Sequence, residues 1–266
     1  MTEMVLSKAI GIFCFIFGTV IASFLNVVIW RVPRGESIVK PASHCPKCNA
    51  EIKWYQNIPI ISYLMLRGKC ANCKTGISPR YVLVEMLGGF LFWAAYWRFG
   101  VYAPIMWVWI ALMIIGSFID FDYKLLPDFV TIGGMIYGLV LAGVNWGLTG
   151  ELGAVFDSLG GLALGFGLLM LIRILGEKAF KREAMGLGDV FLMGAVGAMF
   201  GPIAVIFSLI LSSFLGSIVG VAMILVSKAK IGKQIEIPYG PYICMANLVW
   251  MFYGPKLAGW YLGLLR

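Results

Sequence analysis

The sequence predicts an all-α polytopic membrane protein, with about eight transmembrane helices and a small cytoplasmic loop domain between the first and second. Three observations favour this fold class. Of the 266 residues, 61% are hydrophobic and only 13% are charged, and the mean hydropathy is +0.90. Apolar stretches of membrane-spanning length recur along the chain. A single sizeable polar segment, residues 31–80, interrupts them. Soluble domains of this length do not have such a composition.

The apolar stretches define the candidate spans. They are residues 9–30, 81–97, 101–119, 129–146, 155–175, 190–200, 203–226 and 242–265. The sixth is short and ends at Gly201-Pro202, and the last is interrupted at Gly254-Pro255, so a count of seven is the alternative. The first is too long for a secretory signal and has no small-residue cleavage site, which indicates a retained helix.

Positive charge predicts the orientation of the spans. Residues 31–80 carry nine Lys or Arg against Glu36 and Glu51, which places this loop in the cytoplasm with Met1 outside. The loops that alternation puts on the same side bring the cytoplasmic total to 16 of the 21 Lys and Arg. This bias explains the net charge of +8 without a nucleic-acid partner. The predicted division is a first helix (1–30), a loop domain (31–80) and a helical core (81–266).

Glycines at four-residue spacing favour close packing between the predicted spans. Gly161 and Gly165 are one such pair, and Gly197 and Gly201 are another. Small residues at this spacing let helix backbones approach each other inside a membrane. We therefore expect these positions to lie at helix contacts.

Two cysteine pairs in the polar loop indicate a metal site. Cys45-x2-Cys48 and Cys70-x2-Cys73 are separated by 21 residues, one more than is usual for such pairs. Four thiolates from two tight turns form a tetrahedral zinc site. Disulfides, redox thiols and unligated thiols are the alternatives, and the reducing cytoplasm disfavours disulfides. Because a site with four cysteine ligands has no open position, the zinc organises the loop and does not activate water.

The chain has one histidine, which limits the available chemistry. His44 precedes the first cysteine pair and is either an outer partner of the metal site or an exposed residue. Nucleophilic catalysis by a Ser-His-Asp or Cys-His set therefore has no support. The remaining cysteines, Cys14 and Cys244, lie in apolar spans as core residues.

Carboxylates at the ends of two predicted spans offer a catalytic pair. Asp120 lies in "IDFDYKLLPD" and Asp189 in "GLGDVFL", and the topology places both at the cytoplasmic face. Two facing aspartates share a proton, so that one can activate water while the other protonates a scissile carbonyl. The alternative is structural, because glycine-rich turns are common at helix ends.

Each of the other polar residues near these helix ends has a structural interpretation as well as a functional one. Asp128 suits the first turn of a helix, and Asp122 suits a solvated surface. With Glu177 and Glu183, these acids could also attract a basic segment. Two polar residues lie within apolar spans and either bind a ligand or form interhelical hydrogen bonds; they are Asn26 and Glu85.

Several segments together resemble the type IV prepilin peptidases, the GxGD-type leader peptidase/N-methyltransferases. They are "SFLNVVIWRVPRGES", "NIPIISYLMLRGKC" between the cysteine pairs, "SPRYVLVEMLGG", "IDFDYKLLPD", "GLGDVFL" and "IPYGPYI". The resemblance implies a bacterial inner-membrane aspartic protease that removes the basic leader from type IV prepilins or type II secretion pseudopilins at the cytoplasmic face. It also implies methylation of the new amino terminus with S-adenosylmethionine.

The resemblance also assigns residues. It implies that Asp120 and Asp189 are catalytic, that the cysteine tetrad is the family's zinc site, and that Gly68 takes part in methyl transfer. Phe191 departs from the pattern, because many relatives carry a lysine there, which removes support for a basic residue at that place. No glycine-rich Rossmann fingerprint is present, so the methyl-donor site is not located.

The competing classes are a transporter, a non-enzymatic zinc-bearing assembly protein and a peptidase without methyltransferase activity. A transporter favours polar groups at mid-bilayer, whereas the acids here cluster at one face. An assembly protein would tolerate loss of either aspartate, and a peptidase alone would leave its product unmethylated. The sequence leaves open the pilin substrate, the oligomeric state and which aspartate is the base.

Overall fold

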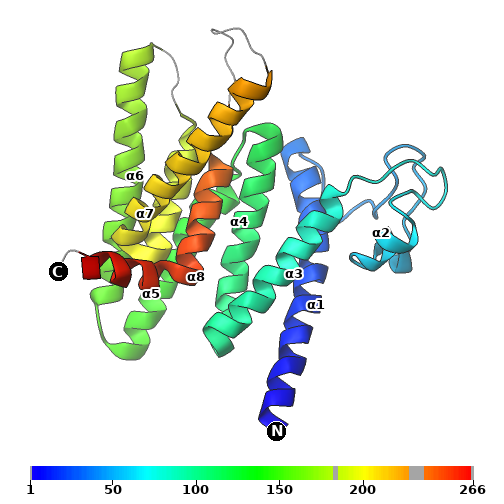
Figure 1. Cartoon of the computed structure of the whole chain (residues 1–266), viewed down its shortest axis with the longest axis horizontal. Coiled ribbons are helices and arrows are strands. Elements are labelled where there is room, and N and C mark those ends of the chain that lie inside the picture. Colours follow the sequence, from blue (N-terminus) through cyan, green and yellow to red (C-terminus); the bar gives the residue numbers. More distant parts are fainter. Residues whose placement is uncertain (1, 182–184, 228–236, 265–266) are drawn as a thin grey trace. The chain divides into compact units, whose positions relative to one another are not determined.

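The computed structural model describes residues 2–181, 185–227 and 237–264 of the chain (Figure 1). Glu183 and the end of the last predicted span lie outside the described residues. The chain forms two compact units, Met1–Ile115 and Gly116–Arg266. Helices dominate the described part of both units, and the loop adds only isolated bridges between His44 and Glu51 and between Lys69 and Gly76.

The N-terminal unit is built on long helices joined by the polar loop. Its elements are α1 (Thr2–Arg31), η1 (Val32–Arg34), η2 (Trp54–Asn57), α2 (Ile61–Met65), α3 (Arg80–Phe99), η3 (Gly100–Tyr102) and the first part of α4 (Ala103–Tyr123). The C-terminal unit contains the end of α4 with α5 (Asp128–Thr149), α6 (Gly153–Phe180), α7 (Leu187–Ser227) and α8 (Gly240–Leu264).

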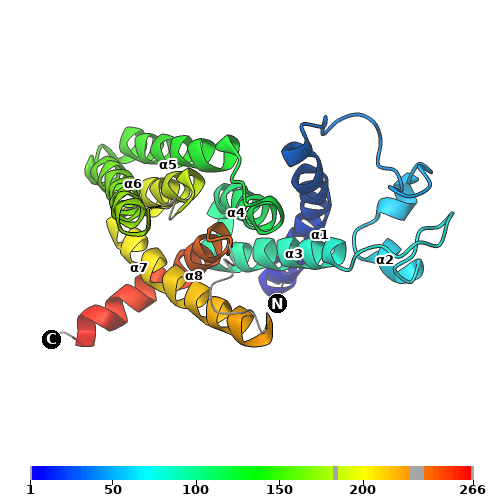
Figure 2. The ribbon, with the colours of Figure 1, turned by 90° about the horizontal axis from the view of Figure 1, so that it is seen from above.

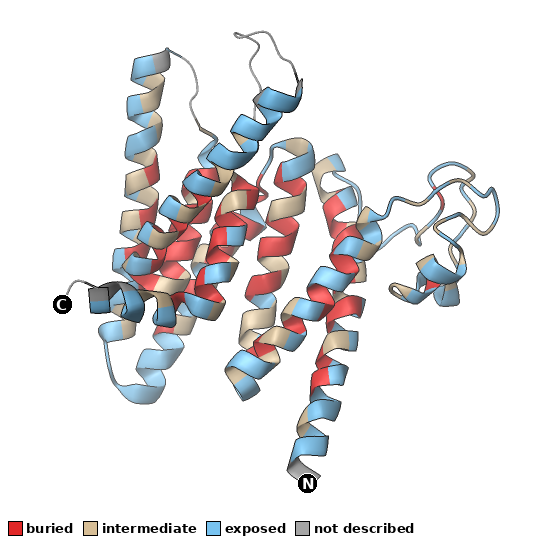
Figure 3. Ribbon diagram, in the orientation of Figure 1, coloured by how far each residue is buried: buried red, intermediate tan, exposed pale blue. Residues whose placement is uncertain are grey.

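Apolar side chains cover the outer faces of the helices. Phe13, Ile136, Phe156 and Ile210 are all more than half exposed, and Figure 3 shows buried residues confined to the inner helix faces. Such surfaces suit lipid and would be costly in water. Among the described residues, five segments are long and apolar enough to cross a membrane: Met4–Arg34, Arg80–Tyr123, Asp128–Thr149, Gly153–Ala179 and Leu187–Met223. The membrane-protein class follows, while the count of eight spans stays a prediction.

Close backbone contact holds α1 against α3 in the N-terminal unit. A Cβ added to Gly18 would lie 2.7 Å from the Gly88 carbonyl oxygen, so only glycine fits at this crossing. The Asn26 side chain donates a hydrogen bond to the Tyr81 carbonyl at 3.1 Å. This bond is the interhelical role that the sequence offered for Asn26.

Glycines make an equally close crossing between α6 and α7. The backbones of Gly161 and Gly197 touch, and a Cβ at Gly165 would overlap the Met193 carbonyl oxygen. The buried Ser158 hydroxyl donates to the Ala198 carbonyl at 2.6 Å across the same interface. The predicted packing role of these glycines is confirmed.

The predicted break at Gly201-Pro202 is present inside α7. Gly201 has a φ of 81° and a ψ of −178°, and Pro202 cannot donate the next backbone hydrogen bond. The two arms of α7 meet there in a V, and both arms point from the break toward the same end of the unit (Figures 1 and 2). Asp189, near the start of the first arm, is therefore carried to that end.

Candidate functional site

The two cysteine pairs fold as equivalent turns. Cys45 N–H donates to Ala50 O at 2.9 Å, and Cys70 N–H donates to Thr75 O at 2.7 Å. The residue after the second cysteine of each pair, Asn49 or Lys74, has a positive φ near 55°. This repetition turns all four sulfurs toward one point, as the spacing predicts.

The four sulfurs have the dimensions of a tetrahedral zinc site. Their ligand atoms all lie within 4.8 Å of one another, and Cys45 Sγ lies 3.8 Å from Cys73 Sγ. A tetrahedron with zinc–sulfur bonds of about 2.3 Å has edges of about 3.8 Å. All six cysteines of the chain are free thiols, so the four cysteines of the cluster form no disulfide in this structure.

Backbone amides of the knuckles stabilise thiolates. A hydrogen bond from the Thr75 backbone lowers the pKa of Cys73 to about 6. The backbone of Cys73, together with that of Asn72, lowers the pKa of Cys70. Because zinc binds thiolate rather than thiol, these amides favour metal binding near neutral pH.

His44 and Gly68 have local roles in the loop. His44 is exposed, and its Nδ1 lies 3.1 Å from the Ala42 carbonyl oxygen. Gly68 has a φ of +65°, and a Cβ there would lie 2.9 Å from the Tyr63 ring. Its carbonyl accepts a hydrogen bond from Ile77 at 2.7 Å, which closes the second knuckle. Only glycine fits this turn, so Gly68 has a structural function whatever its part in methyl transfer.

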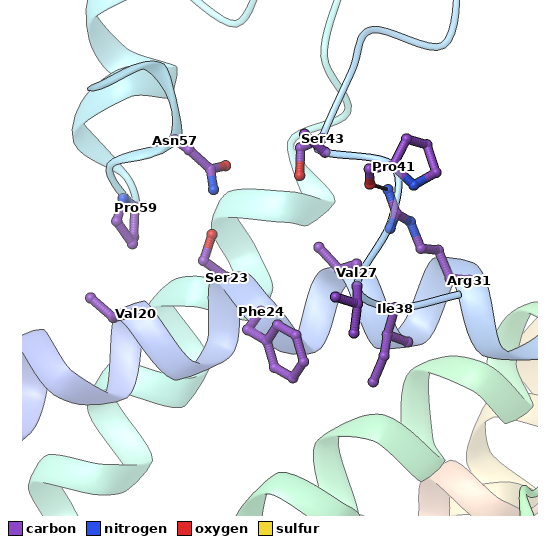
Figure 4. Close-up of a pocket in the computed structure, with 12 residues that line it drawn as sticks. Val20, Ser23, Phe24, Val27, Arg31, Ile38, Pro41, Ser43, Asn57 and Pro59 are labelled. Atoms are coloured by element: carbon purple, nitrogen blue, oxygen red, sulfur yellow. Dashed lines mark hydrogen bonds between the residues drawn. The ribbon is translucent and has the colours of Figure 1, made fainter. Parts of the chain in front are cut away.

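A cavity of about 340 Å³ lies between α1 and the loop in the N-terminal unit. In Figure 4 the side chains of Ser23 and Asn57 point toward one another at this cavity, and Phe24 lines its apolar part. Arg31 at its far end donates to the carbonyls of Ser37 at 2.9 Å and Pro41 at 2.8 Å. The arginine therefore fixes the path of the loop where it leaves α1.

Glu85 holds a strained turn beside this cavity. Ile60, a β-branched residue, has a φ of 62° and a ψ of −53°, and Ile61 N–H bonds Pro59 O at 2.6 Å to close a γ-turn. The buried carboxylate of Glu85 accepts the Ile60 N–H at 2.8 Å. Glu85 also bonds the Ser23 side chain of α1, which is the interhelical role that the sequence offered. Its contact with the loop adds a structural role that sequence reasoning had not identified.

Asp120 is buried at the end of α4 with a specific backbone partner. The residue is 6% exposed, and the Gly240 N–H donates to its Oδ2 at 2.9 Å. A Cβ at Gly240 would lie 2.8 Å from the same oxygen. The glycine therefore permits the backbone of α8 to reach the carboxylate.

Asp189 is brought to Asp120 by the glycines of GLGD. Asp189 is 8% exposed in the first turn of α7, and its charge interacts with that of Asp120. A Cβ at Gly188 would lie 2.9 Å from Leu126, so this glycine lets α7 approach the segment after α4. The structure thus brings together the two aspartates that the sequence singles out.

Two residues at this site carried no individual signal in the sequence. Cys244, 1% exposed, lies near enough for its electrostatic interaction with both aspartates. Tyr239 anchors the start of α8 because its hydroxyl lies 2.7 Å from Ser212 Oγ and 3.1 Å from Ser213 Oγ of α7. Both residues flank Gly240 in or beside "IPYGPYI", and that motif was the available clue.

The other candidate residues lie outside the pair. Asp122 and Asp128 are exposed, and Asp128 begins α5 as predicted. Phe191, where the family resemblance implied a lysine, has its ring centroid 5.5 Å from that of Phe166. That position serves helix packing here.

Two family models match the chain. Residues 16–99 match the bacterial peptidase A24 N-terminal domain, and residues 107–221 match the type IV leader peptidase family. The second match contains both aspartates, and the first contains the four cysteines. No solved structure matches the chain.

Curated relatives share one name, prepilin leader peptidase/N-methyltransferase. The Myxococcus xanthus protein is 40% identical over 85% of this chain and 66% of its own length. The Stutzerimonas stutzeri protein is 33% identical over 94% of this chain and 93% of the relative, and the Pseudomonas aeruginosa protein is 32% identical over 93% and 91%. With both domains matched and the aspartate pair in place, the chain belongs to the type IV leader peptidase family.

Proposed function

We propose that this chain is a membrane aspartic endopeptidase that removes the basic leader from type IV prepilins or pseudopilins and then N-methylates the new terminus. The observation that carries the peptidase function is the buried pair Asp120 and Asp189, which lies inside the leader peptidase match. The relatives' shared name supports both activities. The cut and the methylation take place at the cytoplasmic face in the orientation that the positive loops predict.

The pair has the properties that amide hydrolysis needs. Two carboxyl groups in a poorly solvated site hold one proton between them, because two charges there repel each other. One can deprotonate a water while the other protonates the carbonyl oxygen. The pair titrates as one unit, so its pH profile reports both groups together.

The cysteine centre fits a structural zinc ion. Cys45, Cys48, Cys70 and Cys73 would hold the metal, which leaves no ligand position for substrate. Bound zinc would fix the loop between α1 and α3 through both knuckles. We assign it no role in peptide hydrolysis.

The methyl donor is proposed to be S-adenosylmethionine, which supplies a methyl group to the new terminal amine. Gly68 stays a candidate for this step, and its turn shapes the loop that the zinc would hold. The cavity, where Ser23 and Asn57 face each other, is lined by α1 and by other residues of the same loop. Both features lie in the N-terminal unit, away in sequence from the aspartates.

The experiment is a reconstitution in membranes with a purified type IV prepilin, with and without S-adenosylmethionine, read by the mass of the product. We expect loss of the leader in both reactions and one added methyl group only when the donor is present. An uncut prepilin would overturn the peptidase function. A cut but unmethylated product would leave a peptidase alone.

A further inference from the structure

Building on the proposed function, we infer that the start of α8 decides which aspartate carries the shared proton. Gly240 holds Asp120 as the carboxylate, and Asp189 is the protonated partner. Asp120 is then the base that activates water, and Asp189 is the acid that protonates the scissile carbonyl. Gly240 is a positioning residue, because it acts through Asp120.

Asp120 has a direct backbone donor for a negative charge. Its Oδ2 accepts the Gly240 backbone N–H at 2.9 Å, and a donor to a carboxylate stabilises the ionised form. Gly240 is the first residue of α8, a helix of 25 residues. The positive dipole end of a long helix stabilises a nearby anion further.

The environment of Asp189 disfavours a negative charge. Among the described residues, its Oδ1 is buried and has no hydrogen-bond partner. The Gly186 backbone offers its carboxyl group one donor, which leaves Oδ1 without a partner. An ionised carboxylate with an unpaired buried oxygen is costly, whereas a carboxylic acid brings its own donor. The negative charge on Asp120 adds to this cost.

Within the described part of the chain, the titratable groups that interact with the pair carry no positive charge. The titratable groups that act on the pair are the aspartates themselves, from α4 and α7, and the Cys244 thiol from α8. A thiol is neutral or negative, so it cannot stabilise a charge on Asp189. Lys124, the nearest lysine in sequence to Asp120, is an exposed residue after the end of α4.

These states define each proton transfer. The Asp120 carboxylate takes a proton from water while the water oxygen bonds the carbonyl carbon, and Asp189 gives its proton to the carbonyl oxygen. In the resulting gem-diol, Asp120 passes its proton to the amide nitrogen as the C–N bond breaks. Asp189 takes a proton back from a hydroxyl as the new carboxyl group forms. Both residues return to their starting states.

The site keeps Gly240 at Asp120 through an anchor on the helix that carries Asp189. Tyr239, its neighbour, contacts Ser212 and Ser213 of α7. A side chain at Gly240 has no space, since a Cβ would lie 2.8 Å from Oδ2. Replacement by alanine therefore separates the amide from the carboxylate.

The direct test is infrared difference spectroscopy of the membrane-embedded protein at neutral pH, which detects the C=O stretch of a protonated carboxyl group. We expect Asp189→Asn to lose a band that Asp120→Asn keeps, while any band from Glu85 is common to both variants. The opposite pattern would overturn the assignment. This reading does not depend on activity or on a prepilin.

The kinetic test compares the pH profile of kcat/KM for wild type, Gly240→Ala and a matched control, Gly259→Ala. Gly259 lies in the same helix, and a Cβ added there meets no atom within 4 Å. Loss of a hydrogen bond to the base moves the acid limb of the profile upward by about one pH unit. The control profile stays unchanged. A slower Gly240→Ala enzyme with the wild-type acid limb would show a purely steric role and overturn the inference. If the proposed function itself is wrong, wild type leaves the prepilin uncut, which is a different result.

Discussion

The cysteine centre and the aspartate pair are assembled over very different distances along the chain. Cys45 and Cys73 are 28 residues apart, and each knuckle closes its own turn by backbone hydrogen bonds. Asp120 and Gly240 are 120 residues apart and meet only because α4, α7 and α8 pack together. The first site therefore depends on local turns, and the second depends on helix packing within the C-terminal unit.

The largest expected effect is at the aspartate pair. Asp120→Asn or Asp189→Asn removes a proton-transfer group, and cleavage of a prepilin should fall on the order of a thousandfold or more. The product mass after a timed digestion measures this. The controls Asp122→Asn and Asp128→Asn change exposed residues and should cleave within about twofold of wild type. A well-expressed Asn variant of the pair that cleaves at the wild-type rate would contradict the catalytic assignment.

Loss of one thiolate should affect zinc binding and methylation much more than cleavage. Cys45→Ser leaves three sulfur ligands, so we expect the bound zinc, measured by metal analysis of purified protein, to fall from one per chain to near zero. Methylation should be lost, while cleavage falls less than about tenfold. The control is Cys14→Ala, a core residue of α1 outside the cluster, which should keep its zinc. Full zinc occupancy in Cys45→Ser would refute the four-cysteine centre.

A smaller effect is expected at Gly68. Alanine there must adopt a φ of +65° against the Tyr63 ring, which costs about 1–3 kcal/mol. Zinc affinity measured by competition with a chelator should therefore weaken by about tenfold or more, since the knuckle must be strained to bind metal. Gly76→Ala in the same loop meets nothing within 4 Å and should bind zinc as wild type does. Equal zinc affinities for Gly68→Ala and Gly76→Ala would contradict the structural role of Gly68.

Local turns could be predicted from the sequence, whereas contacts between distant helices could not. Spacing alone predicts the cysteine cluster, because each Cys-x2-Cys turn is local. The sequence also predicts that Asp120 and Asp189 lie at one face, because span ends alternate between the two sides of a membrane. Gly240 and Cys244 were not predicted as neighbours of the pair. Both residues lie near the pair because α8 approaches α4, and the pattern of residues within α8 does not predict how close the two helices come.

Helix positions show the same limit. The glycine spacing predicts the contact of α6 with α7, and Gly201-Pro202 predicts the break in α7. Glu85 was expected to form an interhelical hydrogen bond or bind a ligand. It bonds the Ser23 side chain of α1 as expected, but it also bonds the backbone of Ile60 in the loop. A carboxylate's partner 25 residues away has no signature in composition or spacing, so only the structure reveals it.

The smallest expected effect is at Tyr239, which holds the start of α8 against α7. Tyr239→Phe removes the hydroxyl that contacts Ser212 and Ser213, while the ring keeps its packing. Interhelical hydrogen bonds in membrane proteins contribute about 0.6 kcal/mol on average, so cleavage should slow by only about two- to fivefold. Because the anchor positions Gly240, the loss should appear in kcat/KM for cleavage without a change in zinc content. The matched control, Tyr253→Phe, alters an exposed tyrosine of the same helix and should leave cleavage unchanged. If Tyr239→Phe lowered zinc content and left cleavage intact, the aspartate pair would not depend on this anchor.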